Sequence, residues 1–132
     1  MKALKKIILT DDEEDIITIA RFSFEMMPDV QVKFCHSGQE TIQEALSFLP
    51  DLILLDVMMP NMDGLSTLQA LKLMPSLAPI PVVFLTARSR KEEIKEYKRL
   101  GAFDIIPKPF DPMTLPQTIA TIWEAYQSET HP

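Results

Sequence analysis

Residues 51–64 read DLILLDVMMPNMDG. Four consecutive apolar residues, Leu52 to Leu55, lead directly into a single carboxylate, Asp56, and the chain then turns through residues 59–64. A run that is apolar at every position is typical of a strand covered on both faces, as in a parallel sheet. A carboxylate in such a dry place costs free energy unless it is paired or liganded. The stretch therefore predicts a buried parallel strand and a partner for Asp56.

Short apolar runs alternate with helical patterns along the rest of the chain. Strands are expected at Lys6–Thr10, Gln31–Cys35, Leu52–Asp56, Val82–Thr86 and Phe103–Ile106. Helices are expected at Glu14–Met27, Gln39–Phe48, Leu65–Met74 and Arg90–Leu100, with a last one ending near Gln127. Ser37 and Ser89 each begin a capping-box pattern, and Gly101 stands where a helix C-terminal glycine belongs. This alternation predicts an α/β fold, a doubly wound five-stranded parallel sheet with five helices.

Length and composition narrow the class of protein. The chain has 132 residues, with 46% hydrophobic and 24% charged, which is typical of one globular domain. Its net charge of −6 argues against direct binding to nucleic acid.

No apolar stretch reaches the length of a signal peptide core or a membrane span, so we expect no membrane association. The single cysteine, Cys35, fits a reducing cytoplasm, and with His36 it would make half a zinc site at most, so we interpret both as strand-end residues.

Polar side chains follow four of the five predicted strands. Asp11 and Asp12 come after the first strand, Asp56 ends the third, Thr86 ends the fourth, and Lys108 follows the fifth. In doubly wound sheets, ligands bind beyond the carboxyl ends of the strands. The sequence therefore predicts a functional site at this edge of the sheet.

The residue types at this edge suit phosphoryl transfer. Three neighbouring carboxylates repel one another or recruit a cation, and an all-oxygen cluster favours a hard cation such as Mg²⁺. Lys108 offers an ammonium and Thr86 a hydroxyl to a phosphoryl oxygen. A carboxylate can itself be the nucleophile, and Asp56, at the end of the most apolar strand, is the best candidate.

Other phosphate-handling and hydrolytic sites fit less well. The three glycines, Gly38, Gly64 and Gly101, cannot form a GxGxxG or GxxxxGK[ST] loop, and a GxSxG elbow is absent. A phosphatase of the haloacid-dehalogenase type would need an acid at the position of Met58. What remains is a domain that accepts a phosphoryl group without an obvious means of rapid turnover.

Four stretches together resemble the response-regulator receiver domain of two-component signalling: IILTDDEEDI, DLILLDVMMPNMDG, PVVFLTA and GAFDIIPKPFDP. The resemblance covers nearly the whole chain in order and spacing, and it is to a stand-alone receiver of the chemotaxis-regulator type. It implies a flavodoxin-like sheet with strand order 2-1-3-4-5. It also implies a single receiver domain over residues 1–132, with a folded core of about 5–127 and a tail at 128–132.

The resemblance also implies a metal site. Asp12 would bind Mg²⁺ directly and Asp11 chiefly through water. Asp56 and the backbone carbonyl of Met58 would complete the protein's share of the metal shell.

By the same resemblance, Asp56 is the phosphoacceptor. Thr86 would be the switch hydroxyl, and Lys108 would pair with the phosphate and precede a cis peptide bond to Pro109. The domain would catalyse only its own phosphotransfer and a slow self-dephosphorylation.

The partners implied are a histidine kinase or histidine phosphotransfer protein as the donor, and a downstream protein that contacts the fourth helix, fifth strand and fifth helix. A phosphorylation-dependent dimer is compatible with this reading. One alternative is a receiver cut from a longer regulator with a DNA-binding or enzymatic output. A weaker alternative is an aspartyl-phosphate phosphatase.

The sequence departs from the family pattern in three places. Ile105 replaces the usual aromatic residue three positions before Lys108, and Phe103, expected on the same strand face, would lie about 6–7 Å along it. Since Ile105 has no ring to swing, we expect signalling through the loop that follows Thr86, with Ile105 in one rotamer.

Met58 and Arg88 occupy the two positions that tune phosphate lifetime in the family. Pro116 predicts that the last helix begins irregularly, or afresh near Thr114.

Overall fold

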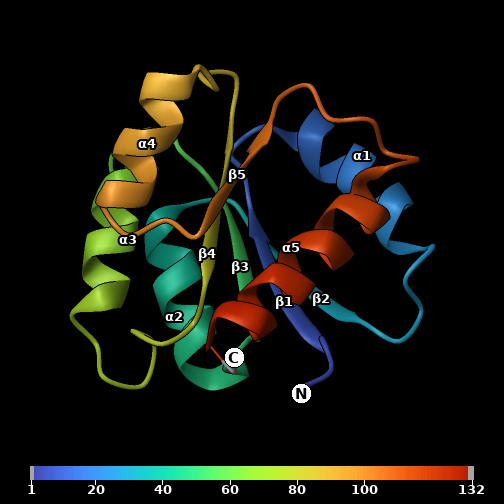
Figure 1. Cartoon of the computed structure of the whole chain (residues 1–132), viewed down its shortest axis with the longest axis horizontal. Helices are drawn as coiled ribbons and strands as arrows, with labels where there is room; N and C mark the ends of the chain where they lie inside the picture. The colour runs from blue at the N-terminus through green and yellow to red at the C-terminus, as the bar shows by residue number, and fades with distance from the viewer. Residues whose placement is uncertain (1, 131–132) are drawn as a thin grey trace.

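The five expected strands form one parallel sheet in a computed structural model that describes residues 2–130 (Figure 1). The sheet order is β2-β1-β3-β4-β5, which confirms the predicted topology. The strands are β1 Lys6–Thr10, β2 Gln31–Cys35, β3 Leu52–Asp56, β4 Val82–Thr86 and β5 Asp104–Pro107. The first four match the prediction to the residue, and β5 begins one residue late. Pro107 is tolerated because β5 is an edge strand.

Helices cover both faces of the sheet, as Figure 1 shows. They are α1 Glu14–Phe24, α2 Gly38–Phe48, α3 Gly64–Lys72, α4 Lys91–Arg99 and α5 Leu115–Thr130. The side chains of α1 and α5 join one apolar cluster with alternate residues of the strands, and those of α2, α3 and α4 join a second cluster on the opposite face. β3 and β4 are buried along their whole length, as their uninterrupted apolar runs predict.

The ends of the helices follow the capping signals only in part. Ser37 caps α2 by accepting from Glu40 N at 3.1 Å. The prediction of Ser89 as a cap is wrong: α4 begins one residue later, and the Glu93 carboxylate accepts from Arg90 N at 3.1 Å. Gly101 follows α4 with φ of 118°, a conformation that glycine adopts at little cost.

Two prolines shape the first and last helices. α1 ends at Phe24 rather than Met27, because Met27 precedes Pro28 and a residue before proline disfavours the helical region. α5 begins at Leu115, after a turn over residues 111–114, so Pro116 lies in its first turn, where the backbone N–H has no helical partner to lose. The helix continues to Thr130, beyond the expected end at Gln127. His131 and Pro132, assigned to the tail, lie outside the described residues.

The expectation that Phe103 shares a face with Ile105 is wrong. The Phe103 ring lies with α5, 5.4 Å from the Tyr126 ring centroid, whereas Ile105 belongs to the cluster on the α4 side. Strand alternation does not extend to Phe103 because β5 begins at Asp104. An aromatic side chain at position 103 therefore has no access to the space beside Ile105.

Within residues 2–130, no helix combines the length and the apolar content that crossing a membrane requires.

Candidate functional site

Asp56 lies at the carboxyl end of β3 with only 2% of its surface exposed. The next residue, Val57, still donates to Leu85 O of β4 at 3.3 Å, so the end of the strand is held on its neighbour. Gly64 N donates to Val57 O at 2.9 Å, and a Cβ on Gly64 would lie 2.5 Å from the Asp56 carbonyl oxygen. Only glycine permits this close approach, which folds residues 58–63 back beside Asp56.

Asp11 and Asp12 reach the same place from the end of β1. Asp11 is fully buried, its N–H donates to Cys35 O at 3.1 Å, and its Oδ1 accepts from Glu13 N at 3.0 Å. Asp12 is exposed at the rim. One carboxylate oxygen from each of Asp11, Asp12 and Asp56 lies within 4.8 Å of the others. The two strands thus assemble the three-acid cluster that the sequence predicts.

Lys108 supplies the positive charge. Its peptide bond to Pro109 is cis, as expected, and its N–H donates to Thr86 O at 2.9 Å. Its Nζ lies 2.6 Å from Asp11 Oδ2 and 3.2 Å from Asp56 Oδ1. Glu13 Oε1, at 4.0 Å, is a further contact that the sequence did not indicate.

The charges of this cluster do not balance. Burial, and then the negative charge of Asp11, raise the pKa of Asp56 to about 7, although Lys108 acts in the opposite direction. Burial lowers the pKa of Lys108, but its contacts with Asp11 and then Asp56 outweigh that effect and raise it overall. Asp56 Oδ2 is buried without a hydrogen-bond partner among the described residues. A buried carboxylate oxygen without a partner, beside two further acids, fits a hard cation.

Thr86 and Met58 lie around this cluster. Thr86 ends β4 with 2% exposure, and its Oγ1 accepts from Arg88 N at 2.9 Å. Met58 N donates to Asp56 Oδ1 at 3.2 Å, while the Met58 side chain is 63% exposed. The structure therefore brings Asp11, Asp12, Asp56 and Lys108 into one cluster, with the Thr86 hydroxyl held by the loop that follows it.

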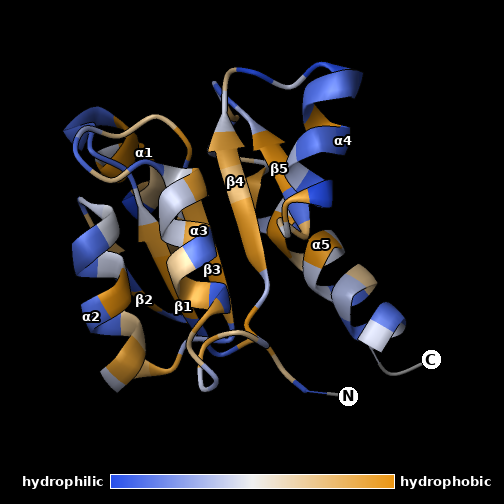
Figure 2. Cartoon of the chain, turned by 90° about the vertical axis from the view of Figure 1, so that its left-hand side faces the viewer, coloured by the Kyte–Doolittle hydropathy of each residue, from blue (hydrophilic) through white to orange (hydrophobic). Residues whose placement is uncertain are grey.

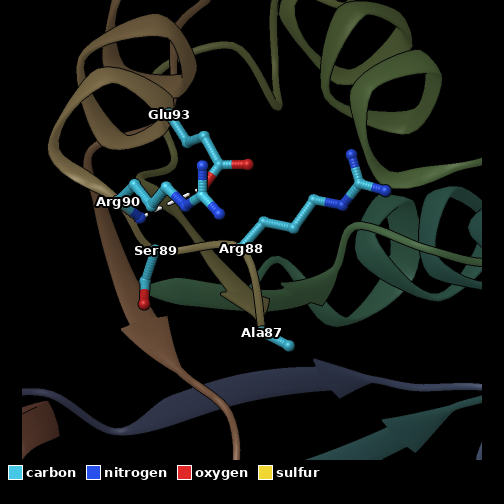
Figure 3. Close-up of a pocket in the computed structure, with 5 residues that line it drawn as sticks. All are labelled: Ala87, Arg88, Ser89, Arg90 and Glu93. Carbon is cyan, nitrogen blue, oxygen red and sulfur yellow. Dashed lines mark hydrogen bonds between the residues drawn. The ribbon is translucent and has the colours of Figure 1, made fainter.

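The loop after Thr86 forms one wall of a pocket of about 450 Å³ (Figure 3). Its lining residues are Ala87, Arg88, Ser89, Arg90 and Glu93. In Figure 3 the Arg88 side chain extends away from Ser89, and the Arg90 side chain lies beside Glu93. The hollow therefore lies between the residues after Thr86 and the first turn of α4.

Cys35 is the last residue of β2 and His36 follows it, which confirms their interpretation as strand-end residues. Cys35 is fully buried, and burial raises the pKa of its thiol to about 12. His36 instead contacts the carboxylates of Glu14 and Glu40 on the surface.

Comparison with known proteins gives consistent results. The family model of the response regulator receiver domain matches residues 7–120. The chain is 35% identical over 108 residues to the alkaline phosphatase synthesis transcriptional regulatory protein PhoP of Bacillus subtilis, covering 82% of this chain and 44% of that protein. It is 35% identical over 119 residues to the transcriptional regulatory protein CpxR of Escherichia coli, covering 90% of this chain and 49% of that protein. The chain thus spans less than half the length of these two relatives.

Solved structures show the same similarity. The chemotaxis response regulator CheY4 of Vibrio cholerae superposes with a TM-score of 0.82 at 27% identity, covering 91% of this chain and 99% of that one. The signal receiver domain of a signal transduction histidine kinase from Syntrophus aciditrophicus superposes with a TM-score of 0.77 at 28% identity, covering 92% of this chain and 91% of that one.

Proposed function

This chain belongs to the family of response regulator receiver domains, and from that premise we propose that it accepts a phosphoryl group on Asp56 in a two-component system or phosphorelay. The observation that carries the proposal is the Asp56 carboxylate, which is buried, has one oxygen without a partner, and lies against Lys108 and two further acids. Burial and the charge of Asp11 disfavour the ionised form of Asp56, and a cation bound at the cluster would offset this effect before phosphoryl transfer.

Mg²⁺ fits the donor set of this site. Asp12, Asp56 and the Met58 carbonyl would hold it directly, and Asp11 through water. Bound there, the ion would neutralise charge on the phosphoryl oxygens. The raised pKa of Asp56 is consistent with this role, because a cation at the cluster would favour the ionised, nucleophilic carboxylate.

The transfer itself needs few groups. A carboxylate oxygen of Asp56 forms a bond to phosphorus while the bond to the donor, a phosphohistidine nitrogen, breaks in line with it. Lys108 Nζ, already 3.2 Å from Asp56 Oδ1, would turn to a phosphoryl oxygen. The Thr86 hydroxyl would donate to another, leaving its present contact with Arg88 N. The rigid end of β3 holds the nucleophile in place.

An apolar surface around α1 offers a contact surface for the donor protein. Ile19 and Phe22 share one face of α1 and are 39% and 53% exposed, and Met26, 42% exposed, follows in the turn after the helix. Met113, 62% exposed, lies nearby, because Ser23 Oγ of α1 donates to Pro112 O at 2.7 Å. We expect Phe22→Ala to slow transfer from a phosphorylated histidine phosphotransfer protein of the native host and to leave labelling by acetyl phosphate unchanged.

Two kinds of protein are candidates for the way in which this receiver passes on its signal. One candidate is a stand-alone signalling module that acts in the cytoplasm through α4, β5 and α5, like the chemotaxis regulator on which the chain superposes. The two transcriptional relatives, spanned over less than half their length, favour a receiver joined to a DNA-binding output. The length of the native gene product separates the two.

Intact-mass spectrometry tests the phosphoacceptor proposal. With acetyl phosphate and Mg²⁺, the protein should gain the mass of one phosphoryl group, and with EDTA it should gain none. Asp56→Ala should gain none in either condition. Equal labelling of Asp56→Ala would contradict the assignment.

A further inference from the structure

Helix α4 is attached to the body of the molecule by very little apolar surface. Of its nine residues, all of them described, only Tyr97 is buried. Ile94 is half-buried, and most of the others are charged and exposed, which gives the helix its hydrophilic colour in Figure 2. A short helix takes most of its stability from tertiary packing, so the position of α4 depends largely on what Tyr97 contacts.

Tyr97 packs on the strand that carries the switch hydroxyl. Its ring meets Phe84 of β4 edge to face, with centroids 5.3 Å apart and planes at 84°. Phe84 is fully buried and stands two residues before Thr86, on the same side of the strand. Ile105 is paired in register with Phe84 and lies in the same cluster. The aromatic ring on this side of β4 thus comes from α4 and not from β5.

We propose that Tyr97 couples the position of α4 to the phosphoryl state of Asp56, through its contact with Phe84. This inference rests on the proposed function. A rotation of Thr86 that aims its hydroxyl at a phosphoryl group withdraws the acceptor from Arg88 N, two residues before Arg90, the N-cap of α4. The loop is then released, and any shift of α4 must slide the Tyr97 ring over Phe84 or break the contact.

The second tyrosine provides an internal control. The chain has two tyrosines, and Tyr126 lies on the opposite face of the sheet, stacked on Trp123 with centroids 5.5 Å apart. Protein labelled with 3-fluorotyrosine should therefore give two ¹⁹F resonances, which Tyr97→Phe assigns by removing one. On saturation with beryllofluoride and Mg²⁺, the Tyr97 resonance should shift and the Tyr126 resonance should not.

A pair of variants separates coupling from mere packing. Tyr97→Leu should bind beryllofluoride about threefold to tenfold more tightly, since the edge-to-face contact that holds α4 in the resting position is lost. Tyr97→Phe keeps the ring and should stay within about twofold of the parent protein. A purely structural Tyr97 would lower the melting temperature of Tyr97→Leu without changing this affinity.

The outcomes are distinct. A bound beryllofluoride signal with an unshifted Tyr97 resonance, or with unchanged affinity in Tyr97→Leu, overturns the coupling and leaves the phosphoacceptor assignment standing. Failure of the parent protein to bind beryllofluoride, or to be labelled by acetyl phosphate, contradicts both.

Discussion

Lys108 Nζ lies 3.2 Å from Asp56 Oδ1, although β4 separates the two strands that bring these residues to the site. The same ammonium lies 2.6 Å from Asp11 Oδ2. One cation therefore serves two buried carboxylates that come from β1 and β3, and a third acid, Asp12, lies at the rim. The resting site has more negative than positive charge, and the following predictions depend on that imbalance.

Removal of Lys108 should destabilise the protein. Lys108→Ala leaves the two buried carboxylates without their cation, and breaking a buried pair in this way costs about 3 kcal/mol. Urea unfolding at pH 8 in EDTA measures the loss. Lys98→Ala is the matched control, because Lys98 pairs with Asp104 at 3.7 Å on the surface and should cost less than about 1 kcal/mol. Equal losses in the two variants would argue against the buried cluster.

The metal-free protein should become less stable as the pH rises from 4 to 8. Asp56 has a pKa of about 7 in the folded protein against 3.8 as its ordinary value, so the folded state binds the proton more tightly. Stability is then lost as the carboxyl ionises between these two values. Lys108, whose pKa is raised above 10.5, keeps its contribution throughout this range.

Asp56→Asn isolates this effect, because the amide does not titrate. The variant should be more stable than the parent by about 1–3 kcal/mol at pH 8 and by roughly a third of that at pH 5, where the unfolded carboxyl is already ionised. Urea midpoints at the two pH values give the comparison. A parent protein that is more stable at pH 8 than at pH 5 would contradict the prediction that ionisation of the buried Asp56 carboxyl destabilises the fold.

Mg²⁺ should raise the melting temperature, because it binds the native acid cluster and not the unfolded chain. Asp12→Asn should reduce this rise and should increase the stability of the metal-free protein. Asp15→Asn removes the same charge from the same acidic run but no ligand atom from the cluster, so it should respond to Mg²⁺ like the parent. Differential scanning fluorimetry with and without millimolar MgCl₂ is sufficient. A parent melting temperature indifferent to Mg²⁺ would contradict the metal site.

Self-dephosphorylation should be slow for the family, because the Met58 side chain offers no hydrogen bond to orient a water for attack on phosphorus. Met58→Asn should therefore accelerate the decay of the phosphorylated protein, followed by intact mass after removal of the donor. Met113→Asn is the control, since Met113 is equally exposed, at 62% against 63%, and lies outside the site. If both variants decay at the parent rate, the side chain at position 58 does not limit hydrolysis.

Much of the fold follows from local signals in the sequence. The apolar runs of β3 and β4 are buried on every residue, and this explains why the predicted bounds of these strands are met. The polar residues after β1, β3, β4 and β5 meet at one edge because parallel strands end on the same side. The site could therefore be anticipated from strand ends alone.

Side-chain directions could not be anticipated in the same way. Phe103 turns toward Tyr126 because the strand begins one residue later, a shift that the sequence pattern does not resolve. Glu13 resembles a solvated helix start, yet its carboxylate lies 4.0 Å from Lys108 Nζ. The role of Tyr97 depends on a contact between α4 and β4, which are separate in the chain, and no local pattern encodes it.

Chemical mapping of the phosphorylated residue tests the central claim most directly. Borohydride reduces an acyl phosphate to the alcohol, so an aspartyl phosphate becomes homoserine and can be located by peptide sequencing in a mass spectrometer. After treatment with acetyl phosphate and Mg²⁺, homoserine should appear at position 56 and at no other position. Homoserine at position 11 or 12, or a phosphoryl group that is retained without any homoserine, would contradict the assignment of Asp56.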